Sequence, residues 1–160
     1  MNEIKEEVLA RLALKLTELG LDKLIARISR PSEEETAERK FSGEDIAMAI
    51  SITRPIRPTV EKFLAKKKIM AQVVEIEGRG RLPPNEEDWT QIVSEFYEIV
   101  LEIQSVLGAP TYHLFVSAPA SLTFALGAVL GLNYDVNIYH WFEELNDYKK
   151  ILNTSRKLLG

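Results

Sequence analysis

The fold class is decided by YHLFVSAPASLTFALGAVLG, residues 112–131, because this stretch passes directly from strand to helix. Its first five residues form a short apolar run, which is typical of a buried β-strand. From Ser117 onward, small residues and leucines recur at helical spacing, and Pro119 suits the first position of a helix. Such a passage is the repeating unit of parallel α/β sheets.

Three further segments have the character of buried strands. They are residues 46–52 (IAMAISI), 70–76 (MAQVVEI) and 135–139 (DVNIY). Between them, apolar residues at helical spacing indicate a helix that begins at Thr59 and a long helix over residues 86–106. Strand and helix alternate four times, which predicts a Rossmann-like α/β fold: an open parallel sheet of about four strands flanked by helices.

Both ends of the chain show a helical pattern. Apolar residues recur three to five apart over residues 3–28, which predicts an amphipathic helix or helix pair with a break at Gly20. Residues 143–159 predict a C-terminal helix, and the polar, charged residues 30–45 indicate a linker or a partly ordered surface helix. We therefore expect an N-terminal helical region with a charged linker over residues 1–44, and a Rossmann-type domain over residues 45–160.

Composition narrows the possible classes of protein. A chain of 160 residues with 46% hydrophobic content suits one compact core. It has no cysteine, which excludes disulfides and thiolate-bound metals and suits a reducing cytosol. The N-terminus has no signal-peptide pattern, and the longest apolar run is too short for a bilayer, so we expect a cytoplasmic protein without a membrane partner. A net charge of −4 argues against tight binding of long nucleic acid but allows a small anionic ligand.

Ligands of open parallel sheets bind at the carboxyl ends of the strands, near the point where the strand order reverses. In this chain, that rule selects the loops at residues 51–57, 77–81, 117–121 and 140–143. The candidate ligand-binding residues in and beside these loops are Ser51, Thr53, Arg54, Arg79, Ser117, Ala118, Pro119, Ala120, Ser121, Tyr139, His140 and Trp141.

The third loop is the most informative of the four. The amides of Ala120 and Ser121, the Ser121 hydroxyl and the positive end of the helix dipole suit a phosphate or a ribose. The small side chains of Ala118 and Ala120 would let a ligand approach the backbone closely. The alternative is an ordinary strand-to-helix turn with a capping serine.

The first two loops carry cations. Ser51, Thr53 and Arg54 combine two hydroxyls with a guanidinium that is able to pair with a phosphate, unless the polar residues simply cap the next helix. Arg79 and Arg81, interleaved with glycines, either fold over an anionic ligand or form a solvent-exposed turn. The motif GRGR is weak by itself.

The last loop carries three rings, Tyr139, His140 and Trp141, on which a nucleobase would stack. The alternative is that Tyr139 or Trp141 packs against the final helix. Catalytic motifs are absent from the sequence, and its two histidines lack metal-ligand spacing. Glu75 and Glu77 have the chemistry of an acid and base pair, but an alternating pair at a strand end is usually solvated. We expect no catalytic residue, no metal and no resident cofactor.

Several ordered motifs of the chain resemble SAVED domains. In residues 113–130 (HLFVSAPASLTFALGAVL) an apolar strand ends at a small-residue and proline turn and enters a small-residue helix with a Leu-Gly step. DVNIYHW, at 135–141, resembles the family's next strand, which ends in tyrosine. AMAISITRPIRPTVEKFL, at 47–64, and EEDWTQIVSEFYEIV, at 86–100, resemble its first strand with the following helix and its tryptophan-containing helix.

This resemblance implies a sensor of cyclic oligonucleotides, among them cyclic tri- or tetra-adenylate, in antiviral defence of the CBASS or type III CRISPR kind. SAVED domains are understood as two fused CARF-like lobes that hold the ligand between them, and binding often drives oligomerisation. This chain departs from the pattern because it contains only the C-terminal type of lobe and no recognisable effector. The missing half would come from a second copy, a separate lobe or effector chain, or a longer protein.

Two other functions stay open from the sequence. CARF-type folds sometimes act as ring nucleases, which open a cyclic oligonucleotide. The other alternative is an adapter subunit, in which the sheet is only a scaffold and the N-terminal helix docks a partner.

Overall fold

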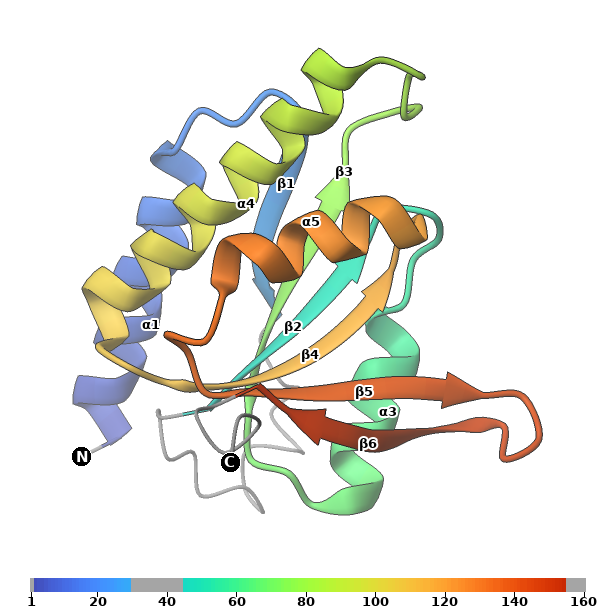
Figure 1. The fold of residues 1–160 in the computed structure, drawn as a ribbon. Coiled ribbons are helices and arrows are strands. Elements are labelled where there is room, and N and C mark those ends of the chain that lie inside the picture. The colour runs from blue at the N-terminus through green and yellow to red at the C-terminus, as the bar shows by residue number, and fades with distance from the viewer. Residues whose placement is uncertain (1, 30–44, 155–160) are drawn as a thin grey trace.

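A computed structural model of the protein describes residues 2–29 and 45–154, which form a six-stranded sheet with helices on both faces (Figure 1). The strands are β1 (Leu24–Ser29), β2 (Asp45–Ser51), β3 (Gln72–Gly78), β4 (Thr111–Ser117), β5 (Val136–Phe142) and β6 (Asp147–Asn153). The helices are α1 (Asn2–Glu18), α3 (Arg57–Lys67), α4 (Glu86–Leu107) and α5 (Ala120–Leu130).

The strand order is β1-β3-β2-β4-β5-β6. Its four central strands, β3, β2, β4 and β5, are parallel, whereas β1 and β6 are antiparallel to their neighbours. The expected α/β fold with four parallel strands is confirmed, and the two edge strands are additions to it.

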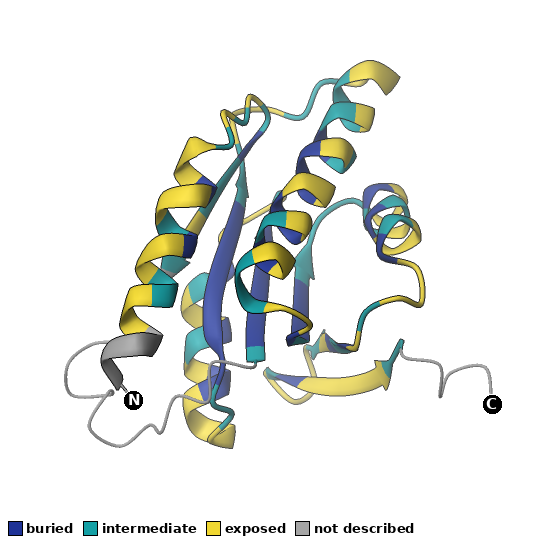
Figure 2. Ribbon diagram, turned by 90° about the vertical axis from the view of Figure 1, so that its left-hand side faces the viewer, coloured by how far each residue is buried: buried dark blue, intermediate teal, exposed yellow. Residues whose placement is uncertain are grey.

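The two faces of the sheet carry different helices. Helices α1, α4 and α5 pack on one face and α3 packs on the other, so that the central strands are buried between two layers (Figure 2). Strand β2 shows how the sequence provides for this arrangement. Ile46, Met48 and Ile50 enter the core beneath α4 and α5, while the small side chains of Ala47 and Ala49 leave room for α3.

The expected N-terminal helix is confirmed as α1, but its predicted continuation beyond Gly20 and the predicted C-terminal helix are wrong where the structure describes strands. The N-terminal helix ends at Glu18, and the chain then forms strand β1, which pairs with β3 from Leu24↔Gly78 to Ser29↔Val73. The C-terminal segment forms β6, which returns along β5 as a hairpin through a turn that includes Asn146 (φ 48°). The antiparallel pairing satisfies backbone groups at both edges of the parallel strands.

Two predictions on the chain ends are not tested by the sheet. The charged segment at residues 30–44 and the last six residues lie outside the described residues. The proposed domain boundary at residue 45 stays a prediction, although β1 belongs to the same sheet and α1 contributes Leu12 and Leu16 to its core.

Helix α4 is the longest described element, and its ends follow from the sequence. The Asn85 side chain accepts a hydrogen bond of 2.8 Å from the amide of Asp88, which caps the helix, and acids occupy its first turn. At the other end Gly108, with φ 80°, closes the helix. Within the described part of the chain, no helix is long and apolar enough to cross a membrane.

Candidate functional site

The strand order reverses between β2 and β4, and the structure joins the two strand ends directly. The carbonyl oxygen of Ser117 accepts hydrogen bonds from the amides of Ile52 (2.9 Å) and Thr53 (2.8 Å). The loop after β2 and the turn before α5 therefore form one continuous backbone surface at the carboxyl edge of the sheet (Figure 1). Five of the predicted ligand-binding residues, at positions 117–121, lie in that turn.

The turn leaves the first amides of α5 without helical partners. Pro119, expected to be the first residue of the helix, is instead its N-cap residue with φ −56° and ψ 145°, and Ala120 begins the helix. The Thr123 amide donates to the Pro119 carbonyl at 2.9 Å, so the preceding amides have no intrahelical acceptor. Ala120 and Ser121 are exposed, and the Ser121 hydroxyl has no partner within residues 2–29 and 45–154. These free amides have the chemistry to bind an anion, and ligand contact at this turn stays a prediction.

The polar residues of the loop after β2 differ in their exposure to solvent. Ser51 is buried, and its hydroxyl accepts a hydrogen bond of 3.1 Å from the Ile56 amide, which fixes the loop. Thr53 and Arg54 are exposed, and Arg54 forms no ion pair within the described residues. Arg57 lies 3.7 Å from a carboxylate oxygen of Glu61, in the first turns of α3. Arg54 is therefore the guanidinium of this loop that is available for a phosphate.

The side chain of Arg79 is directed to the edge strand rather than to the turn before α5. Its amide donates to the Lys23 carbonyl at 2.8 Å, and its Nε donates to the Leu24 carbonyl at 3.3 Å. These bonds hold the end of β3 against the start of β1. Ligand contact by Arg79 stays a prediction, and such contact would require the side chain to leave the Leu24 carbonyl.

The carboxylates of β3 belong to the face covered by α3. Glu75 is buried, and one of its oxygens lies 3.7 Å from Arg27 and 3.8 Å from Arg57. Burial, and then the charge of Glu77, raise the pKa of the Glu75 carboxyl. The two arginines compensate the charge of Glu75 within the protein, which explains why an acid is tolerated in this strand.

The three rings of the fourth site do not meet beside the turn before α5. Strand β5 continues to Phe142, beyond the expected end at Tyr139, and its pairing with β4 stops at Leu114↔Ile138. Its pairing with β6 shifts register between Ile138 and Tyr139. Tyr139 is buried and stacks on Phe115 with ring centroids 4.5 Å apart. These two rings lie on the face of the sheet that carries α3.

The two residues after Tyr139 point to opposite sides. The Trp141 ring packs against Tyr148 of β6, with centroids 5.0 Å apart, so it packs on a strand instead of the expected final helix. His140 is exposed, and strand alternation places it on the same side of the sheet as Ile138, whose side chain packs with the core beneath α5. His140 is therefore the ring of the three that a ligand on the α5 side would reach.

A pocket that sequence reasoning missed lies between the first turns of α4 and α5. Its volume is about 350 Å³, and its lining residues are Pro84, Asn85, Glu86, Trp89, Thr90, Val93, Ser121, Leu122 and Ala125. Ser121 connects it to the turn before α5. The available signal was Trp89, a large side chain near the start of a helix whose indole nitrogen needs a partner.

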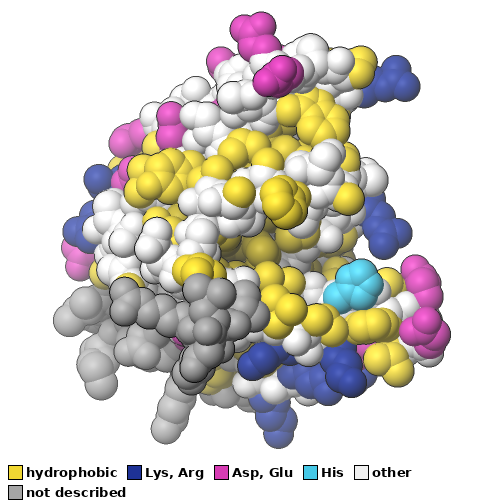
Figure 3. Space-filling model, viewed as in Figure 1, with side chains coloured by type: hydrophobic (Ala, Val, Ile, Leu, Met, Phe, Trp, Pro, Cys, Tyr) yellow, Lys and Arg dark blue, Asp and Glu magenta, His cyan; other side chains and the backbone are white. Residues whose placement is uncertain are grey.

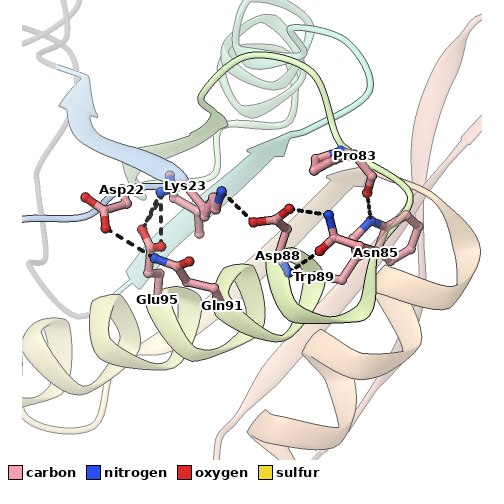
Figure 4. A network of polar contacts seen from close by, with 9 residues as sticks. Asp22, Lys23, Pro83, Asn85, Asp88, Trp89, Gln91 and Glu95 are labelled. Carbon is pink, nitrogen blue, oxygen red and sulfur yellow. Dashed lines mark hydrogen bonds and ion pairs between the residues drawn. The ribbon is translucent and has the colours of Figure 1, made fainter.

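The α4 wall of this pocket is fixed by a polar network (Figure 4). Trp89 donates from Nε1 to the Pro83 carbonyl at 2.7 Å, and the Lys23 ammonium lies 2.6 Å from Asp88. Hydrogen bonding to Asp88 raises the pKa of Lys23, and the same contact lowers the pKa of Asp88. The buried Glu95 carboxylate accepts from the amides of Lys23 and Leu24 at 2.9 to 3.2 Å.

In the described part of the chain, no group of three or more acidic or histidine side chains is placed to hold a metal ion. His113 is engaged inside the core, with Asp45 at 2.9 Å from Nε2 and the Tyr139 hydroxyl at 2.8 Å from Nδ1. This histidine lies away from the carboxyl edge of the sheet.

Residues 25–153 match the SAVED family, the "SMODS-associated and fused to various effectors sensor domain". The chain belongs to the SAVED family. The match covers β6 and all of β1 except Leu24, the two strands whose sequences suggested helices. None of the curated proteins matches the sequence.

Solved structures share the fold of this SAVED chain. The Acinetobacter baumannii Cap4 SAVED/CARF-domain containing receptor with the cyclic trinucleotide 3'3'3'-cAAA has a TM-score of 0.64 at 18% identity, over 84% of this chain and 28% of the receptor. The Moraxella osloensis Cap4 receptor has a TM-score of 0.54 at 15% identity, over 80% of this chain and 25% of that one. The chain thus spans about a quarter of the length of these receptors.

Proposed function

We propose that this SAVED chain is a non-catalytic sensor lobe that binds a cyclic oligonucleotide at the carboxyl edge of its sheet. The observation that carries the proposal is the joined surface of the loop after β2 and the turn before α5, fixed by the two hydrogen bonds to the Ser117 carbonyl. Membership of a sensor family supports the ligand class. The Cap4 receptor with bound 3'3'3'-cAAA supports a cyclic tri-adenylate as the first ligand to test, followed by a cyclic tetra-adenylate.

The exposed groups have the chemistry to hold such a ligand. In the proposal, one phosphate accepts hydrogen bonds from the first amides of α5 and from the Ser121 hydroxyl, where the helix dipole favours negative charge. Arg54 pairs with a second phosphate, and the small side chains of Ala118 and Ala120 allow close approach of the sugar-phosphate ring. His140 is placed to contact a base.

The lobe supplies half of a binding site in this proposal. The chain matches about 28% of the length of the Acinetobacter receptor, and in the proposal the other half comes from a second copy, from a further SAVED or effector chain, or from a longer form of this protein. Binding then promotes assembly, which transmits the signal to an effector in antiviral defence.

Isothermal titration calorimetry with a panel of cyclic di-, tri- and tetranucleotides tests the proposal. Arg54→Ala and Ser121→Ala are expected to weaken binding of the active member by about 10- to 100-fold, as expected for a hydrogen bond to a charged group. Arg11→Ala is the matched control, because Arg11 is an exposed arginine on α1 away from the site. Absence of heat with every member of the panel contradicts the proposed function.

Product analysis separates the sensor from a ring nuclease. Labelled cyclic tetra-adenylate is incubated with the protein and recovered intact if the lobe only binds. Linear product that disappears in Arg54→Ala and Ser121→Ala would show an enzyme instead.

A further inference from the structure

Helix α5 is apolar on its outward side as well as on its inward side. The sequence ASLTFALGAVL contains no charged residue, and Leu122, Leu126 and Leu130 occupy the buried side. On the opposite side Phe124 is 80% exposed, next to the exposed Ala128. A helix at a protein surface normally presents polar residues to water, so an apolar outward side indicates that another surface covers it.

The neighbouring helix extends this apolar surface. Tyr97 and Leu101 of α4 are 39% and 43% exposed, and hydrophobic side chains form a band over α4 and α5 in Figure 3. The pocket between the first turns of α4 and α5 opens beside this band. Its apolar walls are Trp89, Val93 and Ala125, and we call it the α4–α5 socket.

The socket and Phe124 are complementary in size and chemistry. A volume of about 350 Å³ accommodates a phenyl ring, and an aromatic side chain that is transferred from water into apolar walls contributes a large buried area. Phe124 does not line the socket of its own lobe, and its side chain is 80% exposed to solvent. The socket of one lobe therefore fits the Phe124 of another.

We propose that two copies of this chain form a symmetric dimer in which Phe124 of each enters the α4–α5 socket of the other. Phe124 and the socket lie on adjacent parts of the same surface, so a two-fold axis midway between them brings both rings into both sockets at once. The chain carries a net charge of −4, which opposes self-association. Helix α5 brings no charge to the contact, and Glu86 at the start of α4 is the charged residue among those that line the socket.

The dimer adjoins the proposed ligand site. Ser121 lines the socket and also belongs to the turn that holds the phosphate in the proposed function. The inference rests on the proposed function in one respect. That function requires a partner surface, and the dimer identifies a second copy of the chain as its source. Since the two contacts share Ser121, ligand binding and dimerisation are expected to change each other's affinity by the same factor.

Sedimentation velocity of the full chain at concentrations up to about 100 µM tests the interface. The wild type is expected to shift from monomer to dimer as concentration rises. Phe124→Ala is expected to weaken association by about 30-fold or more, as for truncation of a central aromatic anchor. Ala125→Trp, which fills the socket from within the same chain, is expected to have the same effect. Leu145→Ala is the control, because Leu145 is 58% exposed in the β5–β6 turn.

Cysteine cross-linking locates the contact independently. The chain has no native cysteine, so Phe124→Cys and Val93→Cys chains can be mixed and oxidised without background. The mixture is expected to give a disulfide-linked heterodimer, whereas Leu145→Cys mixed with Val93→Cys is not. A wild type that stays monomeric, or a dimer that persists in Phe124→Ala, overturns the interface.

The ligand titration in the same variants keeps the two proposals apart. A monomer that binds a cyclic oligonucleotide would overturn the dimer and leave the sensor function intact. A Phe124-dependent dimer that binds no member of the panel would overturn the sensor function and leave the dimer intact. Loss of ligand heat in Ala125→Trp, with no dimer in the wild type, would assign the socket to the ligand and overturn the dimer.

Discussion

His113 Nδ1 lies 2.8 Å from the hydroxyl oxygen of Tyr139, and this hydrogen bond joins β4 to β5 inside the core. The other ring nitrogen of His113 is engaged by Asp45 at 2.9 Å. Tyr139 is also stacked on Phe115 with an interplanar angle of 12°. The Tyr139 ring is thus held by a polar chain and by aromatic packing, both on the face of the sheet that carries α3.

Tyr139→Phe separates the structural role of this residue from the predicted ligand role. The substitution keeps the ring but leaves the buried His113 nitrogen without its partner, which is expected to cost about 1–3 kcal/mol of unfolding free energy. Urea denaturation measures the loss, and Tyr97→Phe, at an exposed tyrosine of α4, is the control with a change below about 0.5 kcal/mol. Affinity for the active cyclic oligonucleotide should be unchanged in Tyr139→Phe. A large drop in affinity without loss of stability would place Tyr139 in the ligand site.

Tyr112→Phe should act in the opposite direction. The Tyr112 side chain is fully buried, and its hydroxyl has no hydrogen-bond partner in the described part of the protein. Removing a buried, unsatisfied hydroxyl is expected to leave the free energy of unfolding unchanged or to raise it by about 1 kcal/mol. Urea denaturation beside Tyr139→Phe gives a matched pair of tyrosines. Destabilisation by more than about 1 kcal/mol would show that the hydroxyl has a partner.

Stability at alkaline pH should depend on the same residue. Burial, and then the neighbouring Tyr134, raise the pKa of Tyr112 far above its ordinary range. The unfolded chain loses this proton near pH 10 while the folded chain keeps it. The contribution of Tyr112 is therefore complete below about pH 10 and is lost as the pH rises toward its folded pKa. Melting temperatures between pH 8 and 11 should fall less steeply in Tyr112→Phe; equal slopes would contradict the shifted pKa.

The central sheet could be predicted from the sequence because its strands are short apolar runs that are bounded by turns. Residues 46–52 and 112–116 correspond to β2 and β4 within a residue or so. The long helix predicted over residues 86–106 is α4, because its apolar side packs on the sheet at every turn. In these elements, local pattern and burial point to the same structure.

The two edge strands were missed for physical reasons. In β1, Leu24 and Ile28 are four residues apart, a spacing that fits a helix as well as a strand. The strand conformation is decided by pairing with β3, which is distant in the sequence. In β6, Tyr148 is buried whereas Lys149 and Lys150 are exposed, so the strand has little apolar pattern. Its hairpin depends on the turn at Asn146, a residue type that tolerates positive φ.

The candidate site was predictable where it depends on chain order and less so where it depends on side-chain direction. The joining of the loop after β2 to the Ser117 turn follows from the reversal of strand order. By contrast, the stacking of Tyr139 on Phe115 depends on a neighbouring strand, and the direction of Arg79 depends on the unexpected strand β1. Neither feature has a signal within its own segment.

Glu95→Gln tests the network that fixes α4 against β1. The buried Glu95 carboxylate accepts two bonds from the Lys23 amide, at 2.9 and 3.0 Å, and one from the Leu24 amide at 3.2 Å. Glutamine has nearly the same shape, but its NH₂ group would face an N–H donor, so we expect a loss of about 1–3 kcal/mol of unfolding free energy. Urea denaturation measures this loss. Glu98→Gln is the control, because Glu98 is exposed on the same helix and its replacement should change stability by less than about 0.5 kcal/mol. Equal effects of the two substitutions would show that the Glu95 carboxylate does not hold the start of β1. If the network also fixes the Trp89 wall, Glu95→Gln should change Trp89 fluorescence in the folded state, and Glu98→Gln should not.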